Sequence, residues 1–166
     1  MALKSVLVDS LGKLSDWKYR INGMYVSPCS WIGITCNNES RVVALDLSSK
    51  NLTGTFSVSQ EVQLLTRILS FNIRDNQFHG PLLESIFKIY SLRSLDINYN
   101  YFNGSFPMGV SGMNNLVNFT TYSNDFTGTF HGILSSSLIC RCRNFLGVTS
   151  MGAFLDNMVN CPDWST

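Results

Sequence analysis

A pattern that recurs four times at nearly constant spacing constrains this chain more than any other feature. Its clearest copy is LRSLDINYNYFNGSFP at residues 92–107, in which Leu92, Leu95 and Ile97 precede Asn100. Neither a helical period nor plain strand alternation produces this spacing. We interpret the copy as a short strand that buries Leu95 and Ile97 and then turns a corner at Asn100. The amide of that asparagine can satisfy backbone groups where the chain leaves the strand.

The same frame recurs before and after this copy. The marker glycines are separated by 26, 24 and 24 residues and are Gly54, Gly80, Gly104 and Gly128. Fixed spacing in this range is typical of a solenoid in which each repeat forms one coil. The corner asparagines Asn76, Asn100 and Asn124 should then form a ladder in which each bonds the backbone of a neighbouring coil. Lys50 takes the place of asparagine in the first coil.

The frame LxxLxLxxNxFxGxFP resembles the plant-type leucine-rich repeat of receptor-like kinases and receptor-like proteins, over about residues 1–132. The resemblance implies an α/β-type solenoid with a helical N-terminal cap at 1–41 and about four coils with a parallel concave sheet at 42–132. An irregular C-terminal tail would follow at 133–166. The segments TGTF, HGPL, NGSF and TGTF resemble the second strand of the plant class. Within the family, the chain looks closest to the peptide-hormone receptor subfamily that includes the TDIF receptor (PXY) and the more-lateral-growth receptor kinase.

Two segments resemble the cap of this family. The apolar residues are spaced to form one face of a helix and are Leu3, Val6, Leu7, Leu11 and Leu14. Residues 29–36, CSWIGITC, resemble the CxWxGVxC of the same cap, which implies a Cys29–Cys36 disulfide. A pair of free thiols is the alternative at this point.

Recognition in receptors of this type usually occupies the concave surface, so the resemblance directs attention to the polar strand positions. They form two rows across the coils: Asp46, Asn72, Asp96 and Thr120, and then Ser48, Arg74, Asn98 and Tyr122. These side chains could hydrogen-bond an extended peptide that lies across the strands. The alternative is a solvated scaffold face with no ligand.

Beyond about residue 131 the pattern fails. Residues 133–166 contain a serine run, Cys-Arg-Cys and a Met-rich stretch, so we expect a non-repeat tail that is either a makeshift cap or a frameshifted segment. A metal site of His131 with Cys140, Cys142 and Cys161 is disfavoured because C-x-C is poor spacing for structural zinc. A disulfide from Cys161 to one of the other two, or free thiols, fits the odd count better.

Composition and missing motifs exclude several functions. A net charge of +1 with 14% charged residues predicts no attraction to nucleic acid or to an anionic membrane. No catalytic set, cofactor motif or metal motif is visible, and no apolar run approaches the about 20 residues of a membrane span. Four N-glycosylation sequons begin at Asn38, Asn51, Asn103 and Asn118, which favours an extracellular protein, although the first residues do not resemble a signal peptide.

The function expected from these observations is protein or peptide recognition in peptide-hormone signalling. The chain would be a fragment of a receptor-like kinase ectodomain without the transmembrane and kinase parts, and therefore not an enzyme. Its expected partner is a small secreted peptide or another repeat receptor. The alternative is a non-functional truncated product or a purely structural repeat fragment. A repeat inhibitor of wall enzymes is disfavoured because such inhibitors normally have more coils.

Overall fold

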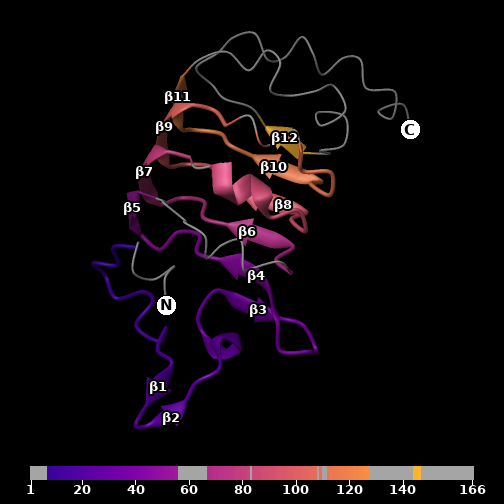
Figure 1. Cartoon of the computed structure of the whole chain (residues 1–166). Coiled ribbons are helices and arrows are strands. Elements are labelled where there is room, and N and C mark those ends of the chain that lie inside the picture. Colours follow the sequence, from indigo (N-terminus) through magenta and orange to yellow (C-terminus); the bar gives the residue numbers. More distant parts are fainter. Residues whose placement is uncertain are drawn as a thin grey trace.

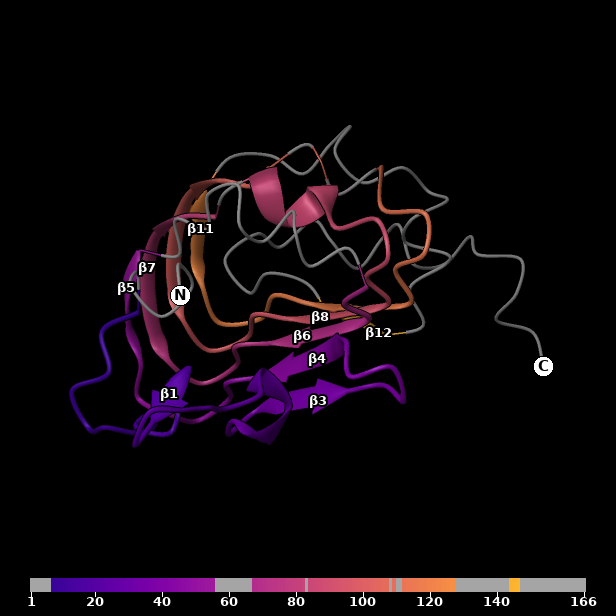
Figure 2. The ribbon, with the colours of Figure 1, turned by 60° about the horizontal axis from the view of Figure 1, so that its bottom comes forward.

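The computed structural model describes residues 7–55, 67–82, 84–107, 109, 112–127 and 144–146, which wind into a stack of coils (Figure 1). A coil contributes one strand to a main sheet and a second strand to another sheet. The two sheets meet at a corner that follows the length of the stack (Figure 2). The solenoid and its parallel sheet are therefore as predicted. We number the coils by their strand pairs: β4 and β5 for coil 1, β6 and β7 for coil 2, β8 and β9 for coil 3, β10 and β11 for coil 4.

The main sheet has the strand order β12-β10-β8-β6-β4-β3. Its strands are β3 (Ile34–Cys36), β4 (Val42–Asp46), β6 (Ser70–Asn72), β8 (Ser94–Asp96), β10 (Asn118–Thr120) and β12 (Asn144–Leu146). β3 is antiparallel to β4, and the other neighbours are parallel. The register aligns Leu45, Phe71, Leu95 and Phe119. The frame read from the sequence is therefore also the frame of the sheet.

The second sheet places a phenylalanine beside a glycine at each step. Its strands, in the order β11-β9-β7-β5, are β5 (Thr53–Thr55), β7 (Gln77–Pro81), β9 (Tyr101–Ser105) and β11 (Asp125–Thr127). The pairs are Phe78 with Gly54, Phe102 with Gly80, and Phe126 with Gly104. The three rings stack with centroid separations of 6.3 Å at each step. Offset stacking at this separation stabilises aromatic pairs beyond simple burial.

The core lies between the two sheets and is closed on the far side by the 3-10 helix η3 (Glu84–Lys88), which buries Ile86 and Phe87 (Figure 2). The buried strand residues include Leu45, Leu47, Phe71, Ile73, Phe78, Leu95, Ile97, Phe102, Phe119 and Phe126. Coil 4 departs from this pattern, because Thr121 occupies the position of Ile97 and its buried hydroxyl has no partner. Burial of the other positions supplies the main driving force for stacking.

Each corner asparagine bonds two coils at once. The Nδ2 of Asn100 donates to the carbonyls of Ile73, Ile97 and Asn98 at 3.0, 3.2 and 3.1 Å, and its Oδ1 accepts from the amide of Phe78 at 3.1 Å. Asn76 and Asn124 make the corresponding bonds to coils 1 and 3. These amides fill the backbone hydrogen-bonding capacity that the corner leaves open. The ladder residues therefore join successive coils through buried polar bonds.

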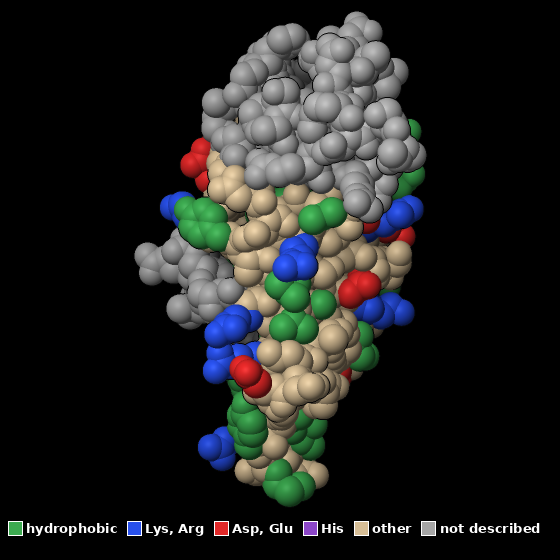
Figure 3. All heavy atoms as spheres, turned by 90° about the vertical axis from the view of Figure 1, so that its right-hand side faces the viewer, with side chains coloured by type: hydrophobic (Ala, Val, Ile, Leu, Met, Phe, Trp, Pro, Cys, Tyr) green, Lys and Arg blue, Asp and Glu red, His purple; other side chains and the backbone are tan. Residues whose placement is uncertain are grey.

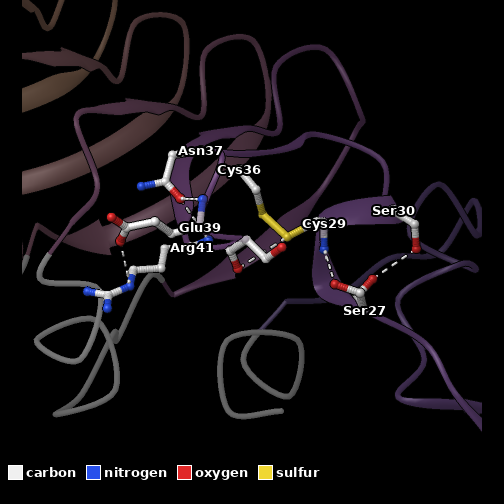
Figure 4. Close-up of a disulfide and its surroundings, with 8 residues drawn as sticks. Ser27, Cys29, Ser30, Cys36, Asn37, Glu39 and Arg41 are labelled. Carbon is white, nitrogen blue, oxygen red and sulfur yellow. Dashed lines mark hydrogen bonds and ion pairs between the residues drawn. A yellow bond between two sulfur atoms is a disulfide. The ribbon is translucent and has the colours of Figure 1, made fainter.

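The cap closes the open end of coil 1. Its elements are β1 (Arg20–Ile21), β2 (Met24–Tyr25), the 3-10 helix η1 (Pro28–Ser30) and β3. Trp17 and Trp31 are buried and stacked at 5.7 Å between ring centroids. The Cys29–Cys36 disulfide is present, with 5.5 Å between its Cα atoms, and links η1 to β3 (Figure 4). A bridge that closes so short a loop stabilises the folded state by roughly 2–3 kcal/mol.

The helical start of the cap is a prediction that needs correction. Residues 7–17 form turns and no α-helix, while residues 1–6 lie outside the described part. The carboxylate of Asp9 accepts the amides of Lys13 and Leu14, both at 2.7 Å, and Gly12 has a φ of +66°. A residue in that left-handed region ends a right-handed helix. Leu7 and Leu14 are buried as predicted, whereas Leu11 is 60% exposed.

The main sheet also continues into the segment that we expected to contain no repeat. β12 pairs in parallel with β10, and Phe145 lies beside Phe119. The interval between these two residues is the same as that between Leu45 and Phe71. The prediction of a tail without repeat structure is therefore wrong for 144–146. The strand was missed because the sequence frame was continued with the interval of the two preceding coils, which is two residues shorter. The apolar positions expected for this coil were therefore placed two residues before those of β12.

None of the helical segments within the described ranges has the length and apolar character needed to cross a lipid bilayer.

Replacement of Asn100 by alanine should destabilise the protein by about 2–3 kcal/mol, because the buried amide of Phe78 would lose its side-chain acceptor and three buried carbonyls would each lose a donor. Asn115→Ala is the matched control, since the Nδ2 of Asn115 makes one exposed bond to the carbonyl of Tyr90. Its expected cost is within about 0.5 kcal/mol. Urea unfolding followed by circular dichroism measures both. Equal losses in the two variants would contradict the role assigned to the ladder.

A second prediction concerns the contact between the cap and coil 1. A Cβ on Gly33 would lie 2.1 Å from the carbonyl oxygen of Asp46, whereas a Cβ on Gly12 would meet no atom within 4 Å. Both glycines have positive φ, so both alanine variants bear a backbone cost of about 1–2 kcal/mol. Gly33→Ala should lose about 1–3 kcal/mol more, from overpacking. Similar midpoints of thermal unfolding for the two variants would disprove this close approach.

Candidate ligand-binding face

The first predicted row of polar residues lies at the ends of the main-sheet strands and shapes the turns that follow them. The Oδ1 of Asp46 accepts the amide of Ser48 at 2.9 Å, and those of Asn72 and Asp96 accept the amides two residues later, both at 3.0 Å. Such side-chain turns are typical of Asp and Asn. Thr120 completes the row in coil 4, where its hydroxyl is buried without a partner. One oxygen of each Asp or Asn in the row is therefore committed to the fold.

The second predicted row is only partly available to a ligand. Arg74 and Tyr122 are exposed and Ser48 is half-buried. Asn98, by contrast, is 6% exposed, and its Oδ1 accepts the backbone amide of Tyr122 in the next coil. Its inclusion among the exposed contact residues is therefore wrong. The short amide side chain reaches an adjacent backbone donor, and burial of that bonded pair costs less than leaving the donor unpaired.

A polar hollow of about 550 Å³ crosses coils 1 to 3 on this face. Its lining combines four predicted residues, Ser48, Asn72, Arg74 and Asp96, with three that were not predicted, Ser49, Asp75 and Tyr99. The three missed residues share one position, directly before the corner residue of their coil, and all have φ between +53° and +57°. This left-handed conformation is uncommon for residues other than glycine. Serine, aspartate and tyrosine at one position gave no recognisable pattern in the sequence.

Contacts between coils hold the residues of the hollow in place. The guanidinium carbon of Arg74 lies 5.1 Å from the ring centroid of Tyr99, and Tyr99 meets Tyr122 edge to face at 5.6 Å. The Ser49 hydroxyl donates to Asp75 at 2.8 Å. Cation–π and aromatic contacts of this kind restrict side chains that would otherwise rotate freely. A ligand would therefore meet a partly preorganised surface.

The electrostatic character of the face is mixed. Arg74 lines the hollow together with Asp75 and Asp96, and none of the described carboxylates forms an ion pair with this arginine. The recorded ion pair joins Arg41 and Glu39 on the cap, at 3.2 Å (Figure 4). Figure 3 likewise shows acidic and basic side chains scattered over one side of the molecule. Such a surface suits a ligand recognised by individual hydrogen bonds and contacts better than one attracted by a strong field.

A second hollow, of about 300 Å³, lies at the corner between the two sheets. Its lining is Ser49, Asn51, Asp75, Asn76, Gln77 and Tyr101. Among the four sequon asparagines, Asn51 is an exposed part of this lining, Asn38 and Asn103 are exposed elsewhere, and Asn118 is half-buried at the start of β10. The two hollows share Ser49 and Asp75, so the hydrogen bond between these side chains forms their common border.

The described residues contain no group of three or more histidine, cysteine or acidic side chains placed to hold a metal ion. His79 is exposed, with Nδ1 3.3 Å from the carbonyl oxygen of Gln77. The predicted tail residues His131, Cys140, Cys142 and Cys161 lie outside the described part. What this face provides is a set of hydrogen-bonding and aromatic groups suited to recognition.

Comparison with known families agrees with the repeat and cap structure. The family described as "Leucine rich repeat N-terminal domain" matches residues 1–37, and the one described as "Leucine Rich Repeat" matches residues 91–113. MDIS1-interacting receptor like kinase 1 of Arabidopsis thaliana is 36% identical over 77% of this chain and 12% of its own length. Receptor-like protein kinase 7 of the same plant is 34% identical over 64% and 11%. The chain thus spans about a tenth of these relatives.

Solved structures give the same result. The ectodomain of the Arabidopsis receptor kinase HAESA, in complex with an N-terminally extended IDA peptide hormone, has a TM-score of 0.69 and 28% identity. The match covers 89% of this chain and 23% of that one. A TDR receptor has a TM-score of 0.53 and 35% identity over 64% and 17%. The cap and repeats of this chain are those of the ectodomains of plant leucine-rich repeat receptor-like kinases. The narrower placement in the TDIF receptor subfamily stays a prediction.

The contribution of a strand-end carboxylate to its turn can be tested at Asp96. Asp96→Ala removes the acceptor for the amide of Asn98 and should destabilise the protein by about 0.5–1.5 kcal/mol. Asp96→Asn keeps an oxygen at that place and should cost less than half as much. Guanidinium unfolding of the two variants measures the difference. An equal loss in both would show that the charge of Asp96, and not its hydrogen bond, supports the turn.

Proposed function

We propose that this chain is part of a receptor ectodomain that recognises a small secreted peptide on the exposed face of its main sheet. The single observation that carries the proposal is the larger hollow, which crosses three coils and is lined by side chains that neighbouring coils hold in position. Its volume lies within the range typical of ligand sites. An extended peptide that runs along the stack would meet Arg74 and Tyr99 as its exposed anchors.

The similar proteins support a peptide as the ligand. HAESA has been crystallised with the peptide hormone IDA and the co-receptor SERK1, and that structure is 27% identical to this chain with a TM-score of 0.71. The match covers 23% of the HAESA chain, so a peptide could also contact coils of a longer receptor that these residues do not include. A second repeat receptor is the other partner that we propose, on the same grounds.

The remaining parts of the proposal concern organisation and location. We assign residues 1–41 to the cap, 42–132 to four coils and 133–166 to a tail whose strand β12 extends the main sheet. We place the chain outside the cell, as part of a glycoprotein. Its described residues act in recognition and not in catalysis, so a kinase activity would have to reside in another part of a longer protein.

One observation favours a second candidate, a structural scaffold without a ligand of its own. Asp46, Asn72 and Asp96 each use one oxygen in a turn, and Asn98 is buried. Polar residues that serve the fold in this way need no ligand to explain them. The two candidates differ at Arg74 and Tyr99, because peptide recognition requires these exposed side chains and a scaffold does not.

Binding assays on the secreted full chain separate the two candidates. Synthetic IDA and TDIF peptides serve as probes in isothermal titration calorimetry, with Arg74→Ala and Tyr99→Ala as test variants. Truncation of a central Arg or Tyr anchor should weaken binding by roughly tenfold or more. Arg93→Ala and Tyr90→Ala are the matched controls, because both residues are exposed and neither lines either of the two hollows described above. The controls should leave the affinity unchanged.

Failure of both peptides to bind the folded chain would contradict peptide recognition by these coils and favour the scaffold. Binding that survives loss of both Arg74 and Tyr99 would move the site away from the larger hollow. A cooperative thermal melt of each variant shows that it is folded.

A further inference from the structure

One of the residues that line the smaller hollow belongs to a glycosylation sequon. Asn51 lines the hollow and begins the triplet Asn51-Leu52-Thr53. It lies where the chain turns from β4 into β5, at the corner between the two sheets (Figure 2). The residue is exposed, while Leu52 is fully buried and Thr53 starts β5. A sugar attached to Asn51 would therefore begin at the edge of a preformed hollow.

The hydrogen bonding of Asn51 leaves the relevant atom available. Its Oδ1 accepts from the Nε2 of Gln77 at 2.5 Å, and a glycan is attached to the other atom of the amide, Nδ2. This bond fixes the plane of the amide against coil 2. Asn51 also has a φ of +56°, a conformation that asparagine tolerates better than most residues. The left-handed backbone conformation is thus a sufficient reason for an asparagine at position 51. It gives no reason for the hollow beside this residue.

The lining of the hollow matches the chemistry of a sugar ring. A pyranose presents C–H groups on one face and hydroxyl groups around its edge. Tyr101 is 57% exposed and supplies an aromatic surface, and Asp75 and Gln77 supply acceptors and a donor. The volume of about 300 Å³ is at the lower end of the range for small-ligand sites. Apolar peptide side chains would find few partners among these groups.

We propose that Asn51 is N-glycosylated and that the first N-acetylglucosamine of the glycan lies in this hollow against Tyr101. The donor is an oligosaccharide linked to a lipid through pyrophosphate. The Nδ2 of Asn51 forms a bond to C1 of the sugar and loses one proton. The bond between C1 and the pyrophosphate oxygen breaks, and the lipid pyrophosphate leaves. Attachment precedes folding, so the hollow acts afterwards by seating a sugar that is already present.

The other sequons lack this combination. Asn38 lies in the exposed turn between β3 and β4, and Asn103 lies on the exposed face of β9. Neither lines the two hollows described above. Asn118 is half-buried at the start of β10, between β8 and β12, where a glycan would disturb the main sheet. Asn103 is therefore the matched control for Asn51, since it is an exposed sequon on the same second sheet.

A seated sugar would border the proposed peptide site. The smaller hollow shares Ser49 and Asp75 with the larger one, so the glycan would close one side of the larger hollow and restrict how a ligand enters it. The inference depends on the proposed function only through the extracellular location. Its test uses no peptide, and failure of one proposal is thus distinguishable from failure of the other.

The first experiment maps glycan occupancy on the full chain, secreted from plant cells that retain high-mannose glycans. Enzymatic release in heavy-oxygen water converts each glycosylated asparagine to a labelled aspartate, which mass spectrometry locates. We expect the label at Asn51 and its loss in Asn51→Gln. Secreted, folded protein that is labelled at Asn38 or Asn103 but not at Asn51 would overturn the proposal.

The second experiment tests whether the sugar is seated. An endoglycosidase that cuts between the first two sugars is applied to the folded protein. Cleavage at Asn51 should be roughly three- to tenfold slower than at Asn103, the range that a single aromatic contact provides. Tyr101→Ala should abolish this difference, and Tyr90→Ala, at a residue that is 65% exposed outside the hollows, should preserve it. Equal rates at the two sites in the unsubstituted chain would overturn the seating.

Discussion

The corners of coils 2 to 4 each depend on a buried primary amide that bonds to two coils at once. Because the chain must leave the main sheet there, several backbone groups have no strand partner, and Asn100 satisfies them through both of its polar atoms. The left-handed residue before each of these corners, the turns at Asn72 and Asp96, and the start of the second sheet all lie next to this amide. Stability and surface shape are thus set at the same position.

Much of this architecture could be predicted from the spacing of a few residue types. The alignment of Leu45, Phe71, Leu95 and Phe119 in the sheet follows from their spacing in the sequence, and so do the buried asparagines. Predictions failed where a local feature outweighed the pattern. Gly12 and the carboxylate of Asp9 replaced a helix by turns, and a longer interval concealed β12. The periodic pattern predicts the strands and corners that every coil shares, but it does not predict local departures such as the turns of the cap.

The candidate site was harder to predict for a related reason. The sequence shows which side chains point away from the core, but not which of them are already bonded within the fold. Asn98 is buried by its bond to the next coil, whereas Asp75 and Tyr99 reach the hollow through a backbone conformation that their residue types do not reveal. The candidate binding surface therefore extends from the strand ends toward the corner between the two sheets.

The strand β12 has a consequence for how such stacks evolve. It pairs with β10 through backbone groups, and these are the same for almost every amino acid. A strand edge can therefore accept a strand from a segment whose surrounding sequence differs from the preceding coils, although β12 itself shares Asn-Phe with β10. Sequence after the last regular repeat can diverge under weak selection without leaving that edge open. The last coil of a solenoid can therefore tolerate more sequence change than the inner coils without loss of the sheet.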